Sequence, residues 1–303
     1  METKRRLTAV DILLLIATVL PLFGCILLQI LCKPTSLDGG IEVSGAYVYA
    51  TIPMPLQPLY ITEVMITSWA VLATIFFLCL FLTRRLSVRC PSARQHLAEW
   101  IVQTTEKLVL DNMGDYFRSY APFIAAIMGI SAFSSLSSLL GLFPPTTDLS
   151  IVAGWAVLVF IIITYYKFKC GPLYYAKGLC ESVFILAPIN VIGEFATPIS
   201  MSFRHYGNVL SGVVVSILVA WALDGASGLL FAWLPEVLGS IPFLRIGIPA
   251  VLSVYFDIFS GCLQAFIFAM LTMMYVSGAF PMEDYFARRA KIEAKKKSKR
   301  GGN

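Results

Sequence analysis

Two apolar stretches near the end of the chain, residues 183–223 and 246–280, constrain the fold more than any other feature of the sequence. The second stretch would be about 52 Å long as a helix, because an α-helix rises 1.5 Å per residue. The hydrocarbon core of a bilayer is only about 30 Å thick, so a helix of this length tilts, kinks or extends beyond the membrane. Four further apolar runs are each long enough to span a bilayer, at residues 10–31, 61–83, 119–143 and 149–168.

The composition agrees with a membrane protein. Hydrophobic residues make up 58% of the 303 residues and charged residues only 14%, whereas soluble domains carry about 25% charged residues. Transmembrane barrels alternate apolar and polar residues in short segments, but the apolar runs in this chain are continuous. We therefore predict an all-α membrane protein with about six transmembrane helices, of which the last two are overlong for the bilayer.

The distribution of Lys and Arg predicts the orientation of these helices. All but three of the 23 Lys and Arg residues lie in segments on the N-terminal side of the membrane. Lys33 and Arg245 lie on the opposite side, and Arg204 lies within the membrane. Because cytoplasmic segments carry the excess of Lys and Arg, we predict a multi-pass protein with both termini in the cytoplasm. The basic N-terminus does not have the pattern of a transit peptide, which favours the bacterial plasma (inner) membrane.

The first apolar run admits two interpretations. Residues 1–6 are rich in basic side chains and precede an apolar segment, as in a signal peptide, and Leu22–Cys25 resembles a lipoprotein cleavage box. The run continues past Cys25 to Leu31, however, and reaches about 20 residues, the length of a spanning helix. We expect a retained transmembrane helix, with cleavage as the alternative.

Residues 92–117 form a separate predicted element on the cytoplasmic side. Ser92 and Gln95 have the spacing of a capping box at the start of a helix. Leu97 and Trp100 follow at helical spacing, with polar residues between them. This pattern predicts an amphipathic helix on the cytoplasmic surface of the membrane, with an exposed linker helix as the alternative.

The sequence shows no second domain. We treat residues 1–303 as a single integral membrane domain with three parts. An N-terminal helix and a partly extended external loop occupy 1–60, the core occupies 61–285, and a basic cytoplasmic tail occupies 286–303. This tail has no accompanying nucleic-acid-binding fold and no interleaved aromatic residues, so we expect no nucleic-acid partner.

Polar residues inside the last two spans suggest a functional site. Ser200, Arg204 and Asn208 follow at i, i+4 and i+8, which places them on one face of a helix. Asp257 and Gln264 are seven residues apart on the last span, again on one face. An Arg side chain stays charged at physiological pH and costs at least about 2.5 kcal/mol at the centre of a bilayer. A chain that keeps such a cation usually handles ions, protons or an anionic ligand.

Each of these residues also has a structural interpretation. Arg204 and Asp257 could form an ion pair that joins the two helices, or Asp257 could be a buried acid that stays neutral. Asn208 and Gln264 could form interhelical hydrogen bonds, which polar residues in membrane bundles often do. For His205, beside Arg204, we favour a role in packing or in tuning the arginine's environment. Two histidines and seven cysteines without a Cys-x-x-Cys pair predict neither a metal centre nor a disulfide framework.

The segments around these residues resemble subunit a of the bacterial, rotary F-type ATP synthase. The most specific matches are Glu194–Asn208 and Asp257–Tyr275, with supporting matches at Pro144–Leu149 and Ile61–Glu63. The resemblance covers about residues 55–285. It identifies the chain as a member of that family.

In that family, subunit a is the stationary ion channel beside a rotating ring of c subunits, and its last two helices lie steeply tilted against the ring. The resemblance implies that Arg204 faces the ring carboxylates, with Gln264 close to it. It implies that Asp257 lines an external half-channel, and it associates Ser200 and Asn208 with a cytoplasmic one. The expected ion-translocation residues are Arg204, Gln264, Asp257, Asn208, Ser200, Glu194, Asp148 and His205.

Two positions depart from the family pattern. His205 stands where an apolar residue is usual, so the environment of Arg204 differs from that of most relatives. Val213 is apolar where some relatives carry an acid that partners a histidine on the last span, which leaves Asp257 to act alone.

The resemblance implies a non-catalytic subunit that carries H⁺ or Na⁺, with H⁺ the commoner ion. Its expected partners are the c-subunit ring, the b-subunit peripheral stalk, the rest of the ATP synthase complex and the lipid bilayer. No cofactor is expected, and the chain carries no phosphate-binding Gly-x-x-x-x-Gly-Lys-Ser/Thr loop. The alternatives are a secondary transporter that binds an anionic substrate at Arg204, and a membrane-embedded enzyme. A transporter predicts internal repeats, and an enzyme needs a nucleophile, base or metal cluster.

Overall fold

The computed structural model describes residues 8–32, 46–55, 58–88, 92–169, 171, 187–230, 251–252, 254–282 and 285–290. Within these ranges, six helices are long and apolar enough to cross a membrane. This confirms the predicted all-α membrane protein with six transmembrane helices. The elements, in chain order, are α1 (Ala9–Cys32), β1 (Val48–Ile52), β2 (Leu59–Thr62), α2 (Glu63–Thr83), α3 (Ala93–Met113), η1 (Asp115–Tyr120), α4 (Ala121–Ser137), η2 (Ser138–Leu140), η3 (Pro145–Thr147), α5 (Leu149–Lys169), α7 (Ala187–Leu230), η5 (Val254–Ser260) and α10 (Gly261–Gly278).

Several boundaries differ from the predicted ones. Helix α2 begins at Glu63 rather than at 61, because the two preceding residues pair in strand β2. Helix α4 ends at Ser137, and the chain then tightens into a 3₁₀ turn and reverses at Gly141, whose φ of 74° favours glycine. Helix α7 continues to Leu230, seven residues beyond the predicted end. The predicted starts of the last two spans, at 183 and 246, lie outside the described residues.

The loop between α1 and α2 contains a small antiparallel hairpin. Strands β1 and β2 pair Ala50 with Ile61 and Ile52 with Leu59. Glu63 continues from this hairpin into α2, and its backbone N–H donates to the carbonyl of Tyr47. The prediction of a partly extended loop is confirmed for the described part of residues 46–62.

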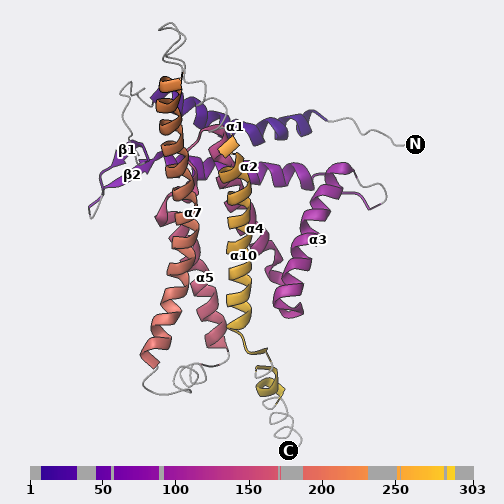
Figure 1. Cartoon of the computed structure of the whole chain (residues 1–303). Coiled ribbons are helices and arrows are strands. Elements are labelled where there is room, and N and C mark those ends of the chain that lie inside the picture. The colour runs from indigo at the N-terminus through magenta and orange to yellow at the C-terminus, as the bar shows by residue number, and fades with distance from the viewer. Residues whose placement is uncertain are drawn as a thin grey trace, which may run out of the picture.

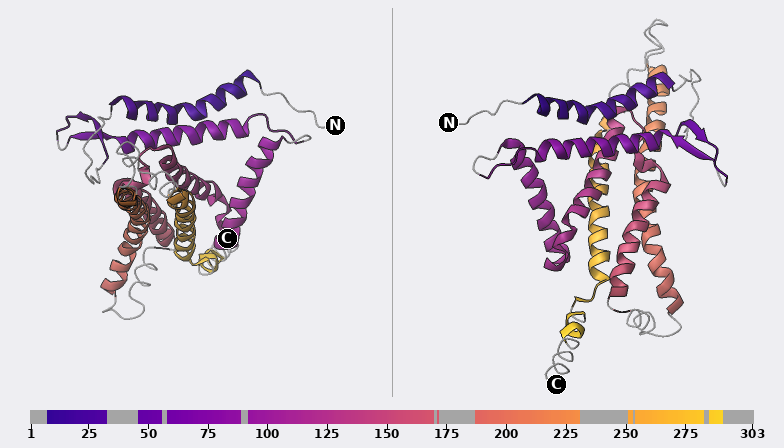
Figure 2. Two further views of the ribbon diagram at one scale, coloured as in Figure 1. Left: turned by 45° about the horizontal axis from the view of Figure 1, so that its top comes forward. Right: turned by 180° about the vertical axis from the view of Figure 1, so that it is seen from behind.

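The helices run in two principal directions. Helices α1 and α2 lie side by side and antiparallel, and they cross the direction shared by α5, α7 and α10 (Figure 1). Helix α3 leaves the end of α2 and also runs across it, on the side where the N-terminus lies (Figure 2). Helix α7 has 44 residues and is therefore about 66 Å long.

An aromatic cluster joins the ends of three helices. The ammonium of Lys169, the last residue of α5, lies 5.3 Å from the ring centre of Tyr116 and 5.8 Å from that of Phe280. It also donates a 2.7 Å hydrogen bond to the Tyr116 hydroxyl. Such cation–π contacts are worth about 0.5–2 kcal/mol each. They hold the end of α5 beside η1 and beside the segment that follows α10, so these three points lie at the same end of the bundle.

A buried carboxylate holds the start of α1 against the junction of α2 and α3. Asp11 is 4% exposed and accepts hydrogen bonds from the backbone and side chain of Thr8. Its Oδ1 lies 3.2 Å from Nη1 of Arg94 and 3.5 Å from Nη1 of Arg84. Arg94 also donates to the Arg84 carbonyl and lies over the ring of Phe81. Burial of a carboxylate is tolerated only with such partners, so this contact fixes α1 to the rest of the chain.

Helix α3 begins as predicted, at a Ser92 cap that accepts from the backbone N–H of Gln95. The second half of the predicted capping box is not formed. The Gln95 side chain instead exchanges two hydrogen bonds with the backbone of Ser87. Leu97 and Trp100 are exposed, whereas Val109 is buried, so α3 presents apolar side chains outward from its first half. It ends at Met113, and Gly114 with φ 80° leads into η1.

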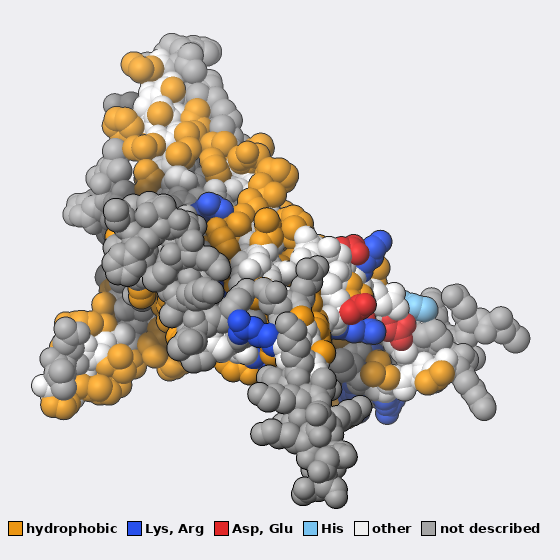
Figure 3. Space-filling view, turned by 90° about the horizontal axis from the view of Figure 1, so that it is seen from below, with side chains coloured by type: hydrophobic (Ala, Val, Ile, Leu, Met, Phe, Trp, Pro, Cys, Tyr) orange, Lys and Arg blue, Asp and Glu red, His pale blue; other side chains and the backbone are white. Residues whose placement is uncertain are grey.

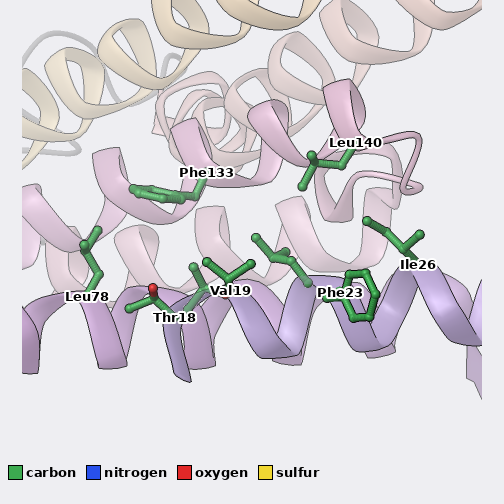
Figure 4. Close-up of a pocket in the computed structure, with 9 residues that line it drawn as sticks. Thr18, Val19, Phe23, Ile26, Leu78, Phe133 and Leu140 are labelled. Carbon is green, nitrogen blue, oxygen red and sulfur yellow. The ribbon is translucent and has the colours of Figure 1, made fainter. Parts of the chain in front are cut away.

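Many large apolar side chains are exposed on the spanning helices, among them Leu13, Ile16, Trp69, Phe76 and Ile161, which suits contact with lipid. The acidic side chains visible in Figure 3 gather, together with several basic ones, on one side of the molecule, and other basic side chains lie near the centre of the view. An apolar cavity of about 280 Å³ lies between α1, α2 and α4. Figure 4 shows Val19 and Phe23 of α1 facing Phe133 and Leu140 across it.

Helices α4 and α10 pack closely against each other at Gly261. A Cβ added there would lie 2.5 Å from the Cβ of Ser135 and 2.8 Å from its Oγ. Real Cβ atoms do not come this close, so only glycine allows the two helix backbones to pack at this point. Phe268 and Met273, further along α10, are almost fully buried in the core that α10 forms with α4 and α5.

We expect Gly261→Ala to force α4 and α10 apart and to lower the stability of the purified protein by about 1–3 kcal/mol, as overpacking does. The Tm in detergent measures this change. Gly129→Ala is the matched control, because a Cβ at Gly129 in α4 meets no atom within 4 Å and alanine favours a helix. Since Ser135→Gly removes the opposing Cβ, it should recover part of the stability of Gly261→Ala. Equal Tm values for Gly261→Ala and the unchanged protein would contradict the close contact.

Candidate functional site

Arg204 lies on the outer face of α7. It is exposed, as are Ser200 one turn before it and its neighbour Phe203. The same surface carries Ile199 and Phe195, both more than half exposed. Within the described residues, Arg204 makes no hydrogen bond or ion pair. The helix therefore presents a permanent cation on an apolar surface, which an apolar solvent alone does not stabilise.

Asp257 points away from this surface and into the bundle. It lies in η5, a seven-residue π-helix, and its Oδ1 accepts a 3.0 Å hydrogen bond from the Ser138 hydroxyl at the end of α4. The described residues form no ion pair between Arg204 and Asp257, so that structural alternative is not supported. π-Helices are rare and are frequently found at functional sites. The same turn interrupts the α-helical spacing on which the predicted shared face of Asp257 and Gln264 depended.

Asn208 links α7 to η5. Its side-chain Nδ2 donates to the Ser260 hydroxyl at 2.9 Å, and that hydroxyl donates back to the side-chain Oδ1 of Asn208 at 3.1 Å. The interhelical hydrogen bond considered for Asn208 is therefore present. One turn later, Gly212 allows Phe256 of η5 to approach, because a Cβ at Gly212 would lie 3.3 Å from that ring. These contacts keep α7 and η5 in register.

His205 is fully buried although its neighbour Arg204 is exposed. Its ring lies edge-on to Trp155 of α5 and Phe268 of α10, and Nε2 lies 3.4 Å from the Ser131 hydroxyl of α4. The packing role that we favoured for His205 agrees with these contacts. Gln264 is also buried, with 5% of its surface exposed.

Glu194 lies at the other end of α7. Its carboxylate accepts a 2.6 Å hydrogen bond from Lys167, and the two side chains form an ion pair in which each is about one-fifth exposed. Because Lys167 lies in the last turn of α5, this pair places the start of α7 beside the end of α5. Glu194 is therefore remote from the end of the bundle that holds Asp257.

Asp148 has a structural role in the observed fold. Its carboxylate accepts a 2.8 Å hydrogen bond from the backbone N–H of Ser150, and its carbonyl accepts from Val152. This is the geometry of a helix N-cap, so Asp148 starts α5.

The structure thus brings two of the expected residues close to each other: Asp257 lies in η5, and Asn208 is hydrogen-bonded to Ser260 of the same element. Arg204 and Ser200 occupy a separate, outer surface, and Glu194 and Asp148 lie near opposite ends of α5. Sequence reasoning did not single out the hydrogen-bonding partners, Ser138, Ser260 and Lys167. A signal for Ser138 existed, because five serines fall between positions 131 and 138 of an otherwise apolar span.

Comparisons with known proteins agree with the resemblance seen in the sequence. The family model for the ATP synthase A chain matches residues 65–277. These residues include the candidate site from Asp148 to Gln264, whereas α1 lies outside them.

Named relatives match over a similar length of the chain. "ATP synthase subunit a, sodium ion specific" of Propionigenium modestum is 28% identical over 242 residues, which cover 74% of this chain and 76% of that protein. "ATP synthase subunit a 1" of Hahella chejuensis is 30% identical over 228 residues, covering 74% of this chain and 86% of that protein. "ATP synthase subunit a" of Bacillus pumilus is 30% identical over 217 residues, covering 67% and 85%.

Substitution of Asp148 separates a capping role from an ion-handling one. Asn caps helices as well as Asp does, and Ala costs about 1 kcal/mol. We therefore expect Asp148→Asn to keep both the Tm of the purified protein and ion transport by the assembly to which it belongs. Asp148→Ala should lower the Tm. Loss of transport in a stably folded Asp148→Asn variant would show that the charge itself is needed.

Proposed function

The chain belongs to the ATP synthase A chain family, and is thus a membrane-sector subunit of ATP synthase, and we propose that it is the stator subunit that conducts ions to and from the c-subunit ring. On this proposal it provides two half-channels, one open to each side of the membrane. Ions pass between them only when carried by carboxylates of the turning ring. The subunit itself catalyses no reaction, and ATP is formed elsewhere in the complex.

The observation that carries the proposal is the exposed guanidinium of Arg204 on the apolar face of α7. A cation in this position needs an anionic partner, and the residues that the structure describes supply none. A carboxylate of the c ring has the required charge and lies within the membrane. Arg204 stabilises the ionised form of that carboxylate by lowering its proton affinity. It also blocks direct passage of a cation between the half-channels.

The two half-channels are proposed to approach Arg204 from opposite ends. Asp257 lies beside Ser138 at the end of α4 that is remote from the Lys169 cluster, and we assign it to the external half-channel. Ser200 lies one turn of α7 before Arg204, on the side toward the Glu194–Lys167 ion pair. We assign Ser200 to the cytoplasmic half-channel. An ion that enters past Asp257 neutralises a ring carboxylate, and the neutral carboxyl enters lipid at far lower cost than the charged form. After nearly a full turn, it releases the ion on the cytoplasmic side.

The helix directions support a strong tilt of the last two spans. If α1 and α2 stand across the bilayer, then α7 and α10, which cross them, lie closer to the membrane plane (Figure 1). A tilted α7 is compatible with its length of about 66 Å, and it offers a long outer face to the ring. In the same orientation α3 lies along the cytoplasmic surface, where the exposed Trp100 and Leu97 reach the lipid interface.

The proposed partners follow from these surfaces. The outer face of α7 contacts the c ring, and the b-subunit peripheral stalk and the remaining subunits hold the chain stationary. Both termini lie in the cytoplasm, and the membrane is the bacterial plasma membrane. We propose H⁺ as the ion, although the Propionigenium modestum relative is named sodium ion specific. A transporter that bound an anionic substrate would enclose its arginine, whereas Arg204 is on the outside of its helix.

The test is ATP-driven ion uptake by proteoliposomes of the purified complex, with unchanged protein and with Arg204→Ala, in the presence and absence of Na⁺. We expect the variant to assemble and to lose uptake by roughly a hundredfold or more, as when a preorganised charge is removed from a reacting centre. Arg118→Ala is the matched control, because Arg118 is well exposed outside the apolar face and pairs only with Glu106. Uptake that persists in the absence of Na⁺ identifies H⁺ as the transported ion. Coupled uptake at the normal rate by Arg204→Ala would falsify the proposal.

A further inference from the structure

We propose that a row of four hydroxyls, three buried on α4 and one half-buried at the start of η2, forms a hydrated proton path from Asp257 to His205, an inference that rests on the proposed ion-conducting function. The row consists of Ser138, Ser135, Ser134 and Ser131. These positions recur at i, i+3, i+4 and i+7, so they share the face of α4 that meets α7, η5 and α10. Their span is about 10 Å along the helix.

Contacts on three other elements establish where this face points. The Ser138 hydroxyl donates to Asp257 of η5. Ser135 lies against Gly261 at the start of α10, and the Ser131 hydroxyl lies 3.4 Å from Nε2 of His205 on α7. The row therefore begins at the one acid of the external half-channel and ends at the residue next to Arg204.

The hydroxyls in the middle of the row lack hydrogen-bond partners. Ser134 is fully buried and Ser135 is 5% exposed, yet neither Oγ is paired within the described part of the chain. A buried hydroxyl without a partner costs about 1–3 kcal/mol, and native proteins almost always satisfy such groups with protein atoms or ordered water. Two adjacent unpaired hydroxyls within one polar row point to bound water between Ser138 and Ser131.

The His205 side chain also points to bound water, at the end of the row that lies next to Arg204. A neutral imidazole has one N–H donor and one acceptor nitrogen. If Nε2 accepts from Ser131, then Nδ1 carries a proton with no acceptor; if Nε2 donates, Nδ1 is an acceptor with no donor. Nδ1 is buried and unpaired in either case, although the ring is otherwise enclosed by Trp155 and Phe268. A water molecule at Nδ1 would supply the missing hydrogen-bond partner in either tautomer.

This chain of groups suits a proton better than Na⁺. Each hydroxyl and each water accepts a proton on one side and donates another on the other, so charge moves without movement of a heavy atom. The imidazole does the same through its two nitrogens. A hard cation instead prefers several oxygen ligands around one point, whereas the row offers single hydroxyls spaced along a helix and ends in nitrogen. From the row we therefore infer that H⁺ is the ion that passes through the external half-channel.

The first experiment compares Ser134→Ala/Ser135→Ala with Ser137→Ala in the purified complex. Two alanines would leave an apolar gap in the middle of the row, and apolar cavities stay dry. We expect ATP-driven H⁺ uptake per assembled complex to fall by roughly tenfold, equivalent to about 1.4 kcal/mol in a barrier. Ser137 is an equally buried serine of α4 whose hydroxyl donates only to the Ser134 carbonyl, so Ser137→Ala should keep normal uptake.

A second measurement reports water directly and does not depend on how well the alanine variant folds. Ser134→Cys and Ser137→Cys are each treated with Ag⁺, a small hydrated cation that blocks accessible thiolates, and are compared with the parent complex and its seven native cysteines. We expect Ag⁺ to inhibit Ser134→Cys and to leave Ser137→Cys like the parent.

The outcomes separate this inference from the proposed function. Normal uptake by Ser134→Ala/Ser135→Ala, or a Ser134→Cys complex as resistant to Ag⁺ as the parent, overturns the hydroxyl path. Such a result leaves the role of Arg204 standing, because Arg204→Ala is measured in the same assay. If Arg204→Ala keeps coupled uptake, the ion-conducting function itself fails, whatever the serine variants show.

Discussion

The close packing of α4 against α10 at Gly261 determines the geometry of the interior. With no side chain at this position, the two backbones approach until Ser135 touches the helix start. The π-helical turn immediately before Gly261 then lies within reach of both α4 and α7. Asp257 meets Ser138 on one side, and Ser260 meets Asn208 on the other. A bulkier residue at Gly261 would separate all three helices at the point where their polar groups meet.

Polar groups in the membrane part of this protein are treated in two contrasting ways. Asp257, Asn208 and His205 are turned inward, where hydroxyls of neighbouring helices partly satisfy them. Arg204 is turned outward on a face that is otherwise apolar. Since a charge inside a bilayer is costly unless it is paired or hydrated, an inward arginine would have been the stable choice for an isolated chain. The outward position of Arg204 agrees with the proposal that another subunit lies along α7.

Much of the fold could be predicted from the sequence, because membrane-spanning helices are specified by long apolar runs. The six spans, the Ser92 cap and the family followed from patterns that are local in the chain. Partners such as Ser138 and Ser260 could not be predicted, because they depend on how helices distant in sequence pack together. The π-helix before Gly261 also has no reliable sequence signature, and it changes which residues face inward. Asp148 was placed among the ion-handling residues on the resemblance alone, although its hydrogen bond to Ser150 gives it a capping role.

The carboxylate of Asp11 has a consequence for the order in which this protein is assembled. Helix α1 leaves the ribosome before α2 and α3, but one of the two arginines that neutralise Asp11 lies on α3, beyond the whole of α2. Until α3 is made, the acid at the start of α1 lacks part of its charge compensation. We therefore expect the contact between α1 and α2 to be completed only when α3 folds back against them. Helix α1, which lies outside the residues that the family model matches, thus acquires its final place from a later part of the chain.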